Sequence, residues 1–289
     1  MAKPMIPLLL DTDIGSDIDD AAALAYLLRQ PRCELLGVTT VTGDTQARAK
    51  LADVLCVQAG RPNLPIYAGR GPVLLEGIGQ PSVPQAEVLK RWPHRKALPS
   101  EALEFLGQTI RSRPGEITLL TIGPLTNIAA LFLYDPEIPK LLKRLVLMAG
   151  NFRSAMAEWN IRVDPVAGAI VFKAPVPEIL SVGLDVTFQC VRPAKEIKKK
   201  FTTPLLRAVV DMMRDRPQIV FHDPLAAAMI FEPGICGWAR GWIEADFHDT
   251  QDRGATRFLD DPKGRHLIAE TVDSARFFRH YYGVVTLKS

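Results

Sequence analysis

The sequence predicts an α/β protein, with an open, mostly parallel sheet and helices on both faces. Short apolar, β-branched segments alternate along the chain with segments whose apolar residues recur at helical spacing. This alternation indicates parallel strands joined by helices that cover the sheet. No linker, internal repeat or low-complexity tract interrupts the pattern, so we expect a single domain over residues 1–289.

The first predicted strand is the apolar run Leu8–Leu10, and helical spacing begins after Asp20. Further strands, each leading into a polar turn, are predicted at Glu34–Val41, Pro65–Tyr67, Glu116–Ile122, Arg144–Met148 and Glu178–Gly183. Helices are predicted at Thr45–Ala59, Ala102–Ile110 with Ser100 as cap, Leu125–Leu133, from Pro165, from Pro193, from Pro204 and at Asp223–Ile230.

The C-terminal part of the chain predicts strands at Trp238–Phe247, Ala255–Leu259 and Arg265–Asp273, followed by a helix at Ser274–Tyr282. The stretch from Gly69 to Pro99 is rich in Gly and Pro and has no clear periodicity. It is long for a loop in a compact domain, which indicates a functional or mobile segment.

Composition excludes several classes of function. The net charge of +3 is small for 289 residues, so we expect neither a nucleic-acid nor a membrane partner. The four cysteines have no CxxC spacing, which argues against a zinc site or a disulfide framework. The N-terminus lacks the pattern of a signal peptide, and no apolar run reaches membrane-spanning length. We therefore expect a cytoplasmic protein.

Five aspartates follow the first strand within ten residues: Asp11, Asp13, Asp17, Asp19 and Asp20. Carboxylates this close repel one another unless a cation or a proton separates them. A hard cation with oxygen ligands is favoured over the alternative, a solvated turn in which Asp19 caps the helix.

Other polar stretches follow the next strands, at Thr42–Asp44, Gly123–Asn127 and Ala149–Asn151. The carboxyl ends of parallel strands meet at one edge of the sheet, where ligands bind in open α/β folds. We therefore expect these stretches to surround the cation.

Seven motifs along the chain combine acidic, amide or small residues with neighbouring apolar ones. They are Asp11–Ala21, Thr39–Asp44, Thr121–Asn127, Val146–Gly150, Glu158-Trp159-Asn160 with Asp164-Pro165, Gly183-Leu184-Asp185 and His222-Asp223-Pro224. Together these motifs resemble the calcium-dependent, inosine–uridine-preferring nucleoside hydrolases. The motifs occur in the family's order over nearly the whole chain. The resemblance implies a Rossmann-like fold and hydrolysis of ribonucleosides to ribose and free base.

The resemblance further implies a calcium site formed by the carboxylates of Asp13, Asp20 and Asp223 and the backbone carbonyl of Ile122. Oxygen ligands without a Cys or His cluster are what Ca²⁺ prefers. Asp19 would be the base that takes a proton from the calcium-bound water, and Asp11 would orient the ligands from behind.

Roles in substrate binding follow from the same resemblance. Glu158 and Asn160 would hold ribose hydroxyls, Met148 would pack beneath the sugar, and Asp44 and Asn151 would add contacts. His222 would protonate the leaving base. A homodimer or homotetramer is implied as well.

The sequence departs from the family pattern in ways that affect the expected choice of base. Two residues are inserted between Gly15 and Asp19, which adds Asp17, and Asp44 stands where an Asn is usual. The segment after Gly71 has no His-Gly pair. No role is assigned to Asp17.

Two other functions remain open. A phosphatase of the haloacid-dehalogenase type would use Asp11 as nucleophile and Asp13 as acid, with Asp260 and Asp261 binding Mg²⁺. A non-catalytic protein that binds ribose or calcium is the second. An EF-hand is excluded, because no loop that begins at Asp11 or Asp13 has Glu at its twelfth position.

Overall fold

A computed structural model describes residues 4–154, 156–248 and 251–287. Its centre is a nine-stranded sheet of order β10-β9-β11-β6-β5-β4-β1-β2-β3. The strands are β1 (Ile6–Thr12), β2 (Cys33–Thr40), β3 (Ile66–Ala68), β4 (Thr118–Thr121), β5 (Arg144–Leu147), β6 (Ile179–Ser181), β9 (Cys236–Ala245), β10 (Thr256–Asp260) and β11 (His266–Val272). A separate pair joins β7 (Val191–Pro193) to β8 (Gln218–Val220).

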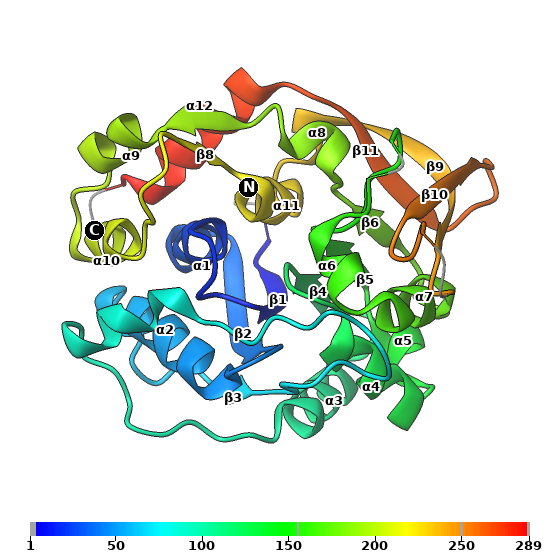
Figure 1. Ribbon diagram of the computed structural model, residues 1–289, viewed down its shortest axis with the longest axis horizontal. Helices are drawn as coiled ribbons and strands as arrows, with labels where there is room; N and C mark the ends of the chain where they lie inside the picture. Colours follow the sequence, from blue (N-terminus) through cyan, green and yellow to red (C-terminus); the bar gives the residue numbers. More distant parts are fainter. Residues whose placement is uncertain (1–3, 155, 249–250, 288–289) are drawn as a thin grey trace.

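The helices alternate with the strands as the sequence predicts (Figure 1). They are α1 (Asp19–Arg29), α2 (Thr45–Gln58), α3 (Ala102–Ser112), α4 (Thr126–Tyr134), α5 (Ile138–Leu141), α6 (Trp159–Val163), α7 (Pro165–Lys173), α8 (Leu184–Thr187), α9 (Ala194–Lys200), α10 (Pro204–Asp211), α11 (His222–Met229) and α12 (Ser274–Val285), with 3₁₀ turns η1 (Pro84–Lys90) and η2 (Pro233–Ile235).

In the order of the sheet, every neighbouring pair from β3 at one edge to β11 is parallel. Only β9 runs antiparallel to its two neighbours, β11 and β10. The predicted mostly parallel α/β architecture is therefore confirmed. One detail was wrong: the residue at the N-cap of α3 is Glu101 rather than Ser100, and no side chain caps that helix.

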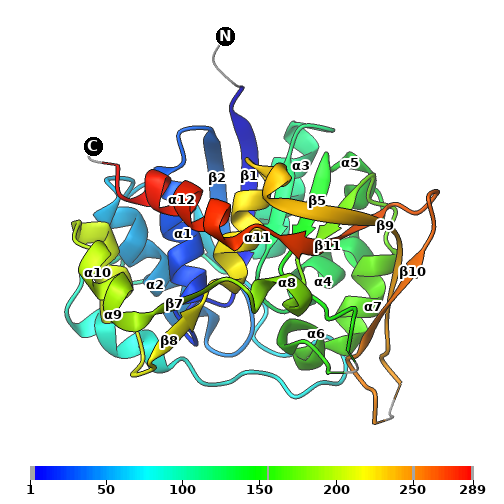
Figure 2. The same ribbon diagram turned by 90° about the horizontal axis from the view of Figure 1, so that it is seen from above.

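Two apolar cores lie on opposite faces of the sheet. Alternate residues of β1 point to opposite faces, so Leu8 and Leu10 join one core and Leu9 the other. The first core includes residues of α1, α2, α10, α11 and α12, and the second includes residues of α3, α4, α5 and α7. Figure 2 shows these two groups of helices on either side of the strands.

Helix α1 packs against α11, although the two are far apart in the sequence (Figure 1). Four of its residues are small alanines, and its residues from Asp19 to Leu27 are all buried. This packing brings the N-terminal ends of α1 and α11 to the same edge of the sheet, where β1 and β4 also end. No helix in the described part of the chain is long and apolar enough to cross a bilayer.

Candidate active site

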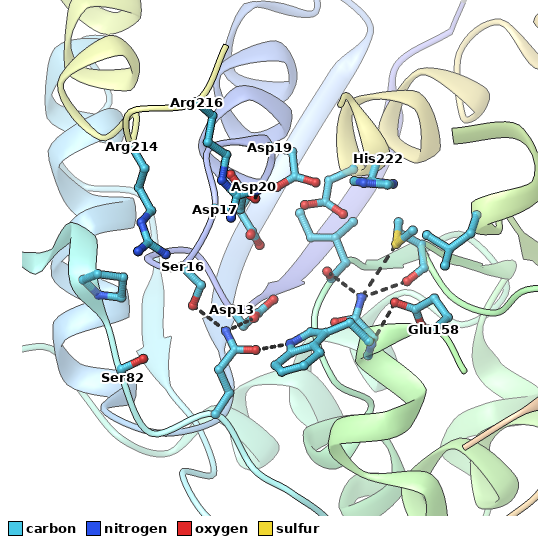
Figure 3. Close-up of a pocket in the computed structure, with 18 residues that line it drawn as sticks. Asp13, Ser16, Asp17, Asp19, Asp20, Ser82, Glu158, Arg214, Arg216 and His222 are labelled. Atoms are coloured by element: carbon cyan, nitrogen blue, oxygen red, sulfur yellow. Dashed lines mark hydrogen bonds and ion pairs between the residues drawn. The ribbon is translucent and has the colours of Figure 1, made fainter. Parts of the chain in front are cut away.

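A cavity of about 450 Å³ opens at the carboxyl ends of the central strands. Figure 3 shows its lining side chains, which come from segments far apart in the sequence. They are Asp13, Ser16, Asp17, Asp19, Asp20, Gln80, Ser82, Pro84, Ile122, Met148, Glu158, Trp159, Asn160, Leu184, Arg214, Arg216, His222 and Asp223.

The aspartate turn joins β1 to α1. The first two residues of α1 are Asp19 and Asp20, where the helix dipole favours negative charge. The expected alternative, Asp19 as N-cap, is not observed, because Ile18 occupies that position. Thr12 Oγ1 donates a hydrogen bond of 2.5 Å to Asp20 Oδ1, which fixes one oxygen of this carboxylate.

Three buried carboxylates form a tight cluster in the cavity. Asp19, Asp20 and Asp223 each contribute one oxygen, and these oxygens lie within 4.8 Å of one another. Asp223 belongs to the first turn of α11, so two helix N-termini converge on the cluster. Asp13 lines the same cavity but is not part of this group of three.

The cluster carries more negative charge than its surroundings can solvate. Burial raises the pKa of Asp20 and Asp223 well above the usual range, and repulsion from the neighbouring aspartates raises both further. Burial and the charge of Asp17 raise the pKa of Asp19 to about 7. A cation bound among these oxygens would relieve both effects. The donors of the cluster are carboxylates, and Ile122, with its backbone carbonyl, lines the same cavity, a set of oxygens that fits a hard divalent cation.

Another part of the cavity lining is built by Glu158 and Asn160. Glu158 caps α6 and accepts hydrogen bonds from the backbone N–H groups of Asn160 (2.8 Å) and Ile161 (3.2 Å). Burial raises its pKa to about 7. Asn160 Nδ2 donates to the carbonyls of Ile122 (3.1 Å) and Met148 (3.0 Å), which ties α6 to the ends of β4 and β5.

His222 stands beside Asp223 at the start of α11. Its Nδ1 is 2.7 Å from the hydroxyl of Thr187, so Nε2 is the nitrogen outside this bond. Burial lowers the pKa of His222 to about 4, and the charge of Asp17 only partly opposes this effect. The ring is therefore neutral at physiological pH in the ligand-free protein.

Other predicted site residues lie outside the cavity lining. Asp11 is fully buried behind it and accepts hydrogen bonds from Thr39 Oγ1 and Asn127 Nδ2. Asn151 is buried, with its Nδ2 bound to Ser154 Oγ (2.7 Å) and to the carbonyl of Met156 (3.0 Å). Asn151 is thus engaged within its own loop, and its expected contact with the substrate stays a prediction.

Asp44, the other expected substrate contact, also lies outside the cavity lining. Its exposed side chain is the N-cap of α2 and accepts a hydrogen bond of 2.9 Å from Ala47 N. A carboxylate held on the first turn of α2 does not reach the cavity.

Several lining residues were not anticipated from the sequence. Gln80 comes from the long segment between Gly69 and Pro99, and its Nε2 donates to Asp13 Oδ2 at 2.8 Å and to Ser16 Oγ. Its Oε1 accepts from Trp159 Nε1. The length of the segment was the one sequence signal for this residue, because Gln80 itself belongs to no local motif.

The loop between α10 and β8 adds Arg214 and Arg216 to the cavity mouth (Figure 3). Arg216 pairs with Asp17 at 2.7 Å, and both side chains are substantially exposed. The inserted Asp17, which had no assigned role, thus links the aspartate turn to a loop nearly two hundred residues later.

The comparisons with known proteins agree with this geometry. A model of the family described as "Inosine-uridine preferring nucleoside hydrolase" matches residues 8–279. The chain is 29% identical to uridine nucleosidase 1 of Arabidopsis thaliana, covering 87% of this chain and 83% of that protein. It is 37% identical to an uncharacterized protein of Schizosaccharomyces pombe, covering 68% of this chain and 67% of that protein.

Solved structures give the same result. A plant nucleoside hydrolase, PpNRh1, superposes with a TM-score of 0.84 at 27% identity, covering 99% of this chain and 100% of that one. A purine-preferring ribonucleoside hydrolase from Gardnerella vaginalis also gives 0.84, at 26% identity and with 97% and 98% covered. The match spans the strands and helices that form the cavity, and the chain therefore belongs to the inosine–uridine preferring nucleoside hydrolase family, whose members are N-glycosidases.

Proposed function

We propose that this enzyme cleaves the N-glycosidic bond of ribonucleosides with the aid of Ca²⁺. The observation that carries the proposal is the cluster of Asp19, Asp20 and Asp223 beside the Ile122 carbonyl. Asp20, Asp223 and Ile122 would hold the ion, with Asp13 as the fourth protein ligand. Calcium is favoured over zinc because all of these donors are oxygens.

Bound calcium would orient the attacking water and lower its pKa. Asp19, whose carboxylate is buried in the same cluster, would take the proton of that water. Glu158, Asn160 and Met148, which line the same cavity, bind the ribose. The anionic oxygens around the sugar stabilise the positive charge that develops at the anomeric carbon in the transition state.

His222 assists departure of the base. When the Thr187 hydroxyl donates to Nδ1, the neutral ring carries its proton on Nε2, and in that tautomer the Nε2–H group would donate a hydrogen bond to the leaving base. The lowered pKa thus favours a neutral hydrogen-bond donor over an imidazolium acid.

No observation on the described residues specifically supports either of the other two candidate functions. Asp260 and Asp261, the magnesium ligands of the phosphatase hypothesis, belong to or follow β10 at the sheet edge and do not line the cavity. Asp11, its nucleophile, is buried behind the cavity and bonded to Thr39 and Asn127. A purely binding role leaves the buried base Asp19 unused.

The test is a ribose-release assay on inosine, adenosine, guanosine, uridine and cytidine, with and without a calcium chelator. We expect calcium-dependent release from at least one nucleoside, with uridine and inosine tried first because of the relatives' names. Activity that survives exhaustive chelation would contradict the role of the metal. Tight calcium binding without turnover of any nucleoside would favour the binding protein.

Removing one carboxylate tests the ligand assignment separately. Asp20→Ala should abolish both tight calcium binding and hydrolysis, because it removes a buried anionic ligand at the centre of the cluster. Calorimetry with CaCl₂ measures the binding directly. Calcium affinity equal to that of the wild type would refute Asp20 as a ligand. Asp135→Ala, on an exposed ion pair with Arg111, is the matched control and should leave both quantities unchanged.

A further inference from the structure

Arg48 of α2 is a fully buried cation next to the candidate active site. Among the residues that the structure describes, its guanidinium donates only to uncharged acceptors. They are the carbonyls of Thr42 (2.7 Å), Asp13, Ile14 (3.2 Å), Gln80 (3.3 Å) and Ser82 (3.5 Å), and the hydroxyl of Ser16 (3.1 Å).

These acceptors belong to three loops without regular structure. One is the aspartate turn between β1 and α1, one is the turn after β2, and the third is the long segment that carries Gln80 and Ser82. Buried carbonyl groups outside helices and sheets need a donor from elsewhere. The planar fork of a guanidinium offers five N–H groups in fixed directions, which lets one side chain serve all three loops.

The space around Arg48 is filled. A Cβ atom built at Gly15, which has φ of +127°, would lie 2.5 Å from Val83 Cγ1 and 3.4 Å from Arg48 Nη1. The backbone of the aspartate turn therefore lies directly against both Arg48 and the long segment. Gln80 completes the connection, because its side chain binds Asp13 Oδ2 and Ser16 Oγ while its own carbonyl accepts from Arg48.

A buried charge is costly when no carboxylate is bonded to it. Within the described residues Arg48 forms no salt bridge, and its positive charge only partly opposes the burial that raises the pKa of Asp13 and Asp20. Packing alone does not explain a cation here, because an apolar side chain would fill the volume without this cost.

We propose that Arg48 is a positioning residue for the metal and substrate sites. It holds the aspartate turn against the segment of Gln80 and Ser82, so that Asp13 and Gln80 face the cavity together. The inference rests on the proposed function, since it assumes that Asp13 is a calcium ligand and that the cavity binds a nucleoside.

The test compares Arg48→Lys with the wild type and with Arg61→Lys. Lysine keeps the positive charge but lacks the planar, multiply donating guanidinium. The variant therefore distinguishes the effect of the hydrogen-bond geometry from the effect of the charge. Arg61, just beyond the end of α2, donates to the carbonyl of Leu35 at 3.0 Å, away from the cavity, and is the matched control. Calorimetry with CaCl₂ gives the calcium Kd, and ribose release gives KM and kcat at saturating calcium.

For Arg48→Lys we expect the calcium Kd and the nucleoside KM each to rise about tenfold, with kcat changed less than about threefold. Arg61→Lys should match the wild type in all three. A merely structural role would lower kcat with the fraction of folded protein while leaving Kd and KM unchanged. That pattern, or wild-type values for Arg48→Lys, would overturn the proposal.

If Arg48→Lys does not fold, Ser16→Ala provides the second test. It removes an acceptor that Arg48 and Gln80 share, while the buried cation stays in place. We expect its calcium Kd and KM to rise in parallel by a smaller factor, and unchanged values would overturn the proposal. A wild-type protein that neither binds calcium nor hydrolyses nucleosides overturns the proposed function too. If the wild type does both and the variants show no rise in Kd or KM, only the role proposed for Arg48 is overturned.

Discussion

Individual carboxylates in this site differ because their hydrogen-bond partners differ. Thr12 fixes Asp20, Gln80 and the charge of Arg48 act on Asp13, and backbone amides hold Glu158. Burial and the charge of Asp17 raise the pKa of Asp19 to about 7. The environment of each side chain, rather than the shared residue type, distinguishes a base from a ligand.

His222 gives a prediction at this scale. His222→Ala should slow uridine or inosine by about tenfold to a hundredfold, because it removes a hydrogen bond to a base that gains negative charge as it leaves. The loss on p-nitrophenyl riboside should be much smaller, because p-nitrophenolate leaves without a proton. Steady-state kinetics on both substrates measure the difference, and equal losses would remove His222 from departure of the base. His94→Ala, on a histidine outside the cavity lining, is the control.

Site residues could be predicted to different extents from the sequence. Aspartates in the first turns of two helices and a strand-end carbonyl were found because each belongs to a motif of its own. Gln80 and Arg48 were not found. Gln80 lies in a segment without periodicity, and only the position of Arg48 on α2 shows that its side chain faces inward. Asp44 was assigned by its place in a motif, but its carboxylate caps the helix that follows.

Among the elements, the ends of β1 and β4 are packed too closely for any side chain at Gly123. A Cβ there would lie 2.8 Å from Asp13 N and 2.9 Å from Asp13 Oδ1. Gly123→Ala should therefore displace the aspartate turn and weaken calcium binding about tenfold or more. Gly283→Ala, where a Cβ meets no atom within 4 Å, is the control. Calorimetry on the two variants checks this, and equal affinities would contradict the close approach.

The link between the aspartate turn and the α10–β8 loop gives another prediction. The Asp17–Arg216 pair is exposed, so Arg216→Met should lower the free energy of unfolding by no more than about 1 kcal/mol. Its effect should fall on substrate binding, because both residues line the cavity mouth. We expect a higher KM and an unchanged calcium Kd, with the difference from the wild type shrinking in high salt. A large loss of stability would show that the pair is structural.

Helices and strands were predicted more completely than the site, because burial on both faces of a parallel sheet leaves long apolar runs. The error at Ser100 concerned one end of α3, where no side chain caps the helix. Residues between Gly69 and Pro99 could not be predicted, because their path is set by contacts with Asp13, Ser16 and Arg48 rather than by local preference.

The whole molecule should respond to pH through its buried acids. Burial raises the pKa of Asp11, Asp19 and Glu158 to about 7, whereas carboxyl groups in the unfolded chain titrate near 4. The folded state therefore binds more protons between about pH 4 and pH 7, and the free energy of unfolding falls as the pH rises through that window. Burial lowers the pKa of His222 and His266 to about 4, which opposes this trend below about pH 6.5. The acids with a raised pKa are more numerous, so their effect is the larger one.

We accordingly expect the Tm of the chelated protein to be lower at about pH 8 than at about pH 6. Calcium should raise the Tm more at the higher pH, because binding must displace protons from the cluster at the lower one. Differential scanning calorimetry at both pH values, with CaCl₂ and with chelator, checks both statements. A Tm of the chelated protein that increases from pH 6 to pH 8 would contradict the raised pKa values.

The packing of α1 against α11 also has a consequence for synthesis of the chain. β1 and α1 leave the ribosome early. The strand β4, which pairs with one edge of β1, and the helix α11, which packs against α1, are translated much later. Asp19 and Asp20 must therefore remain hydrated until Asp223 arrives. If the cluster binds calcium as proposed, the complete site forms only after Asp223 has been translated, so the ion would stabilise the nearly complete fold and not its early steps.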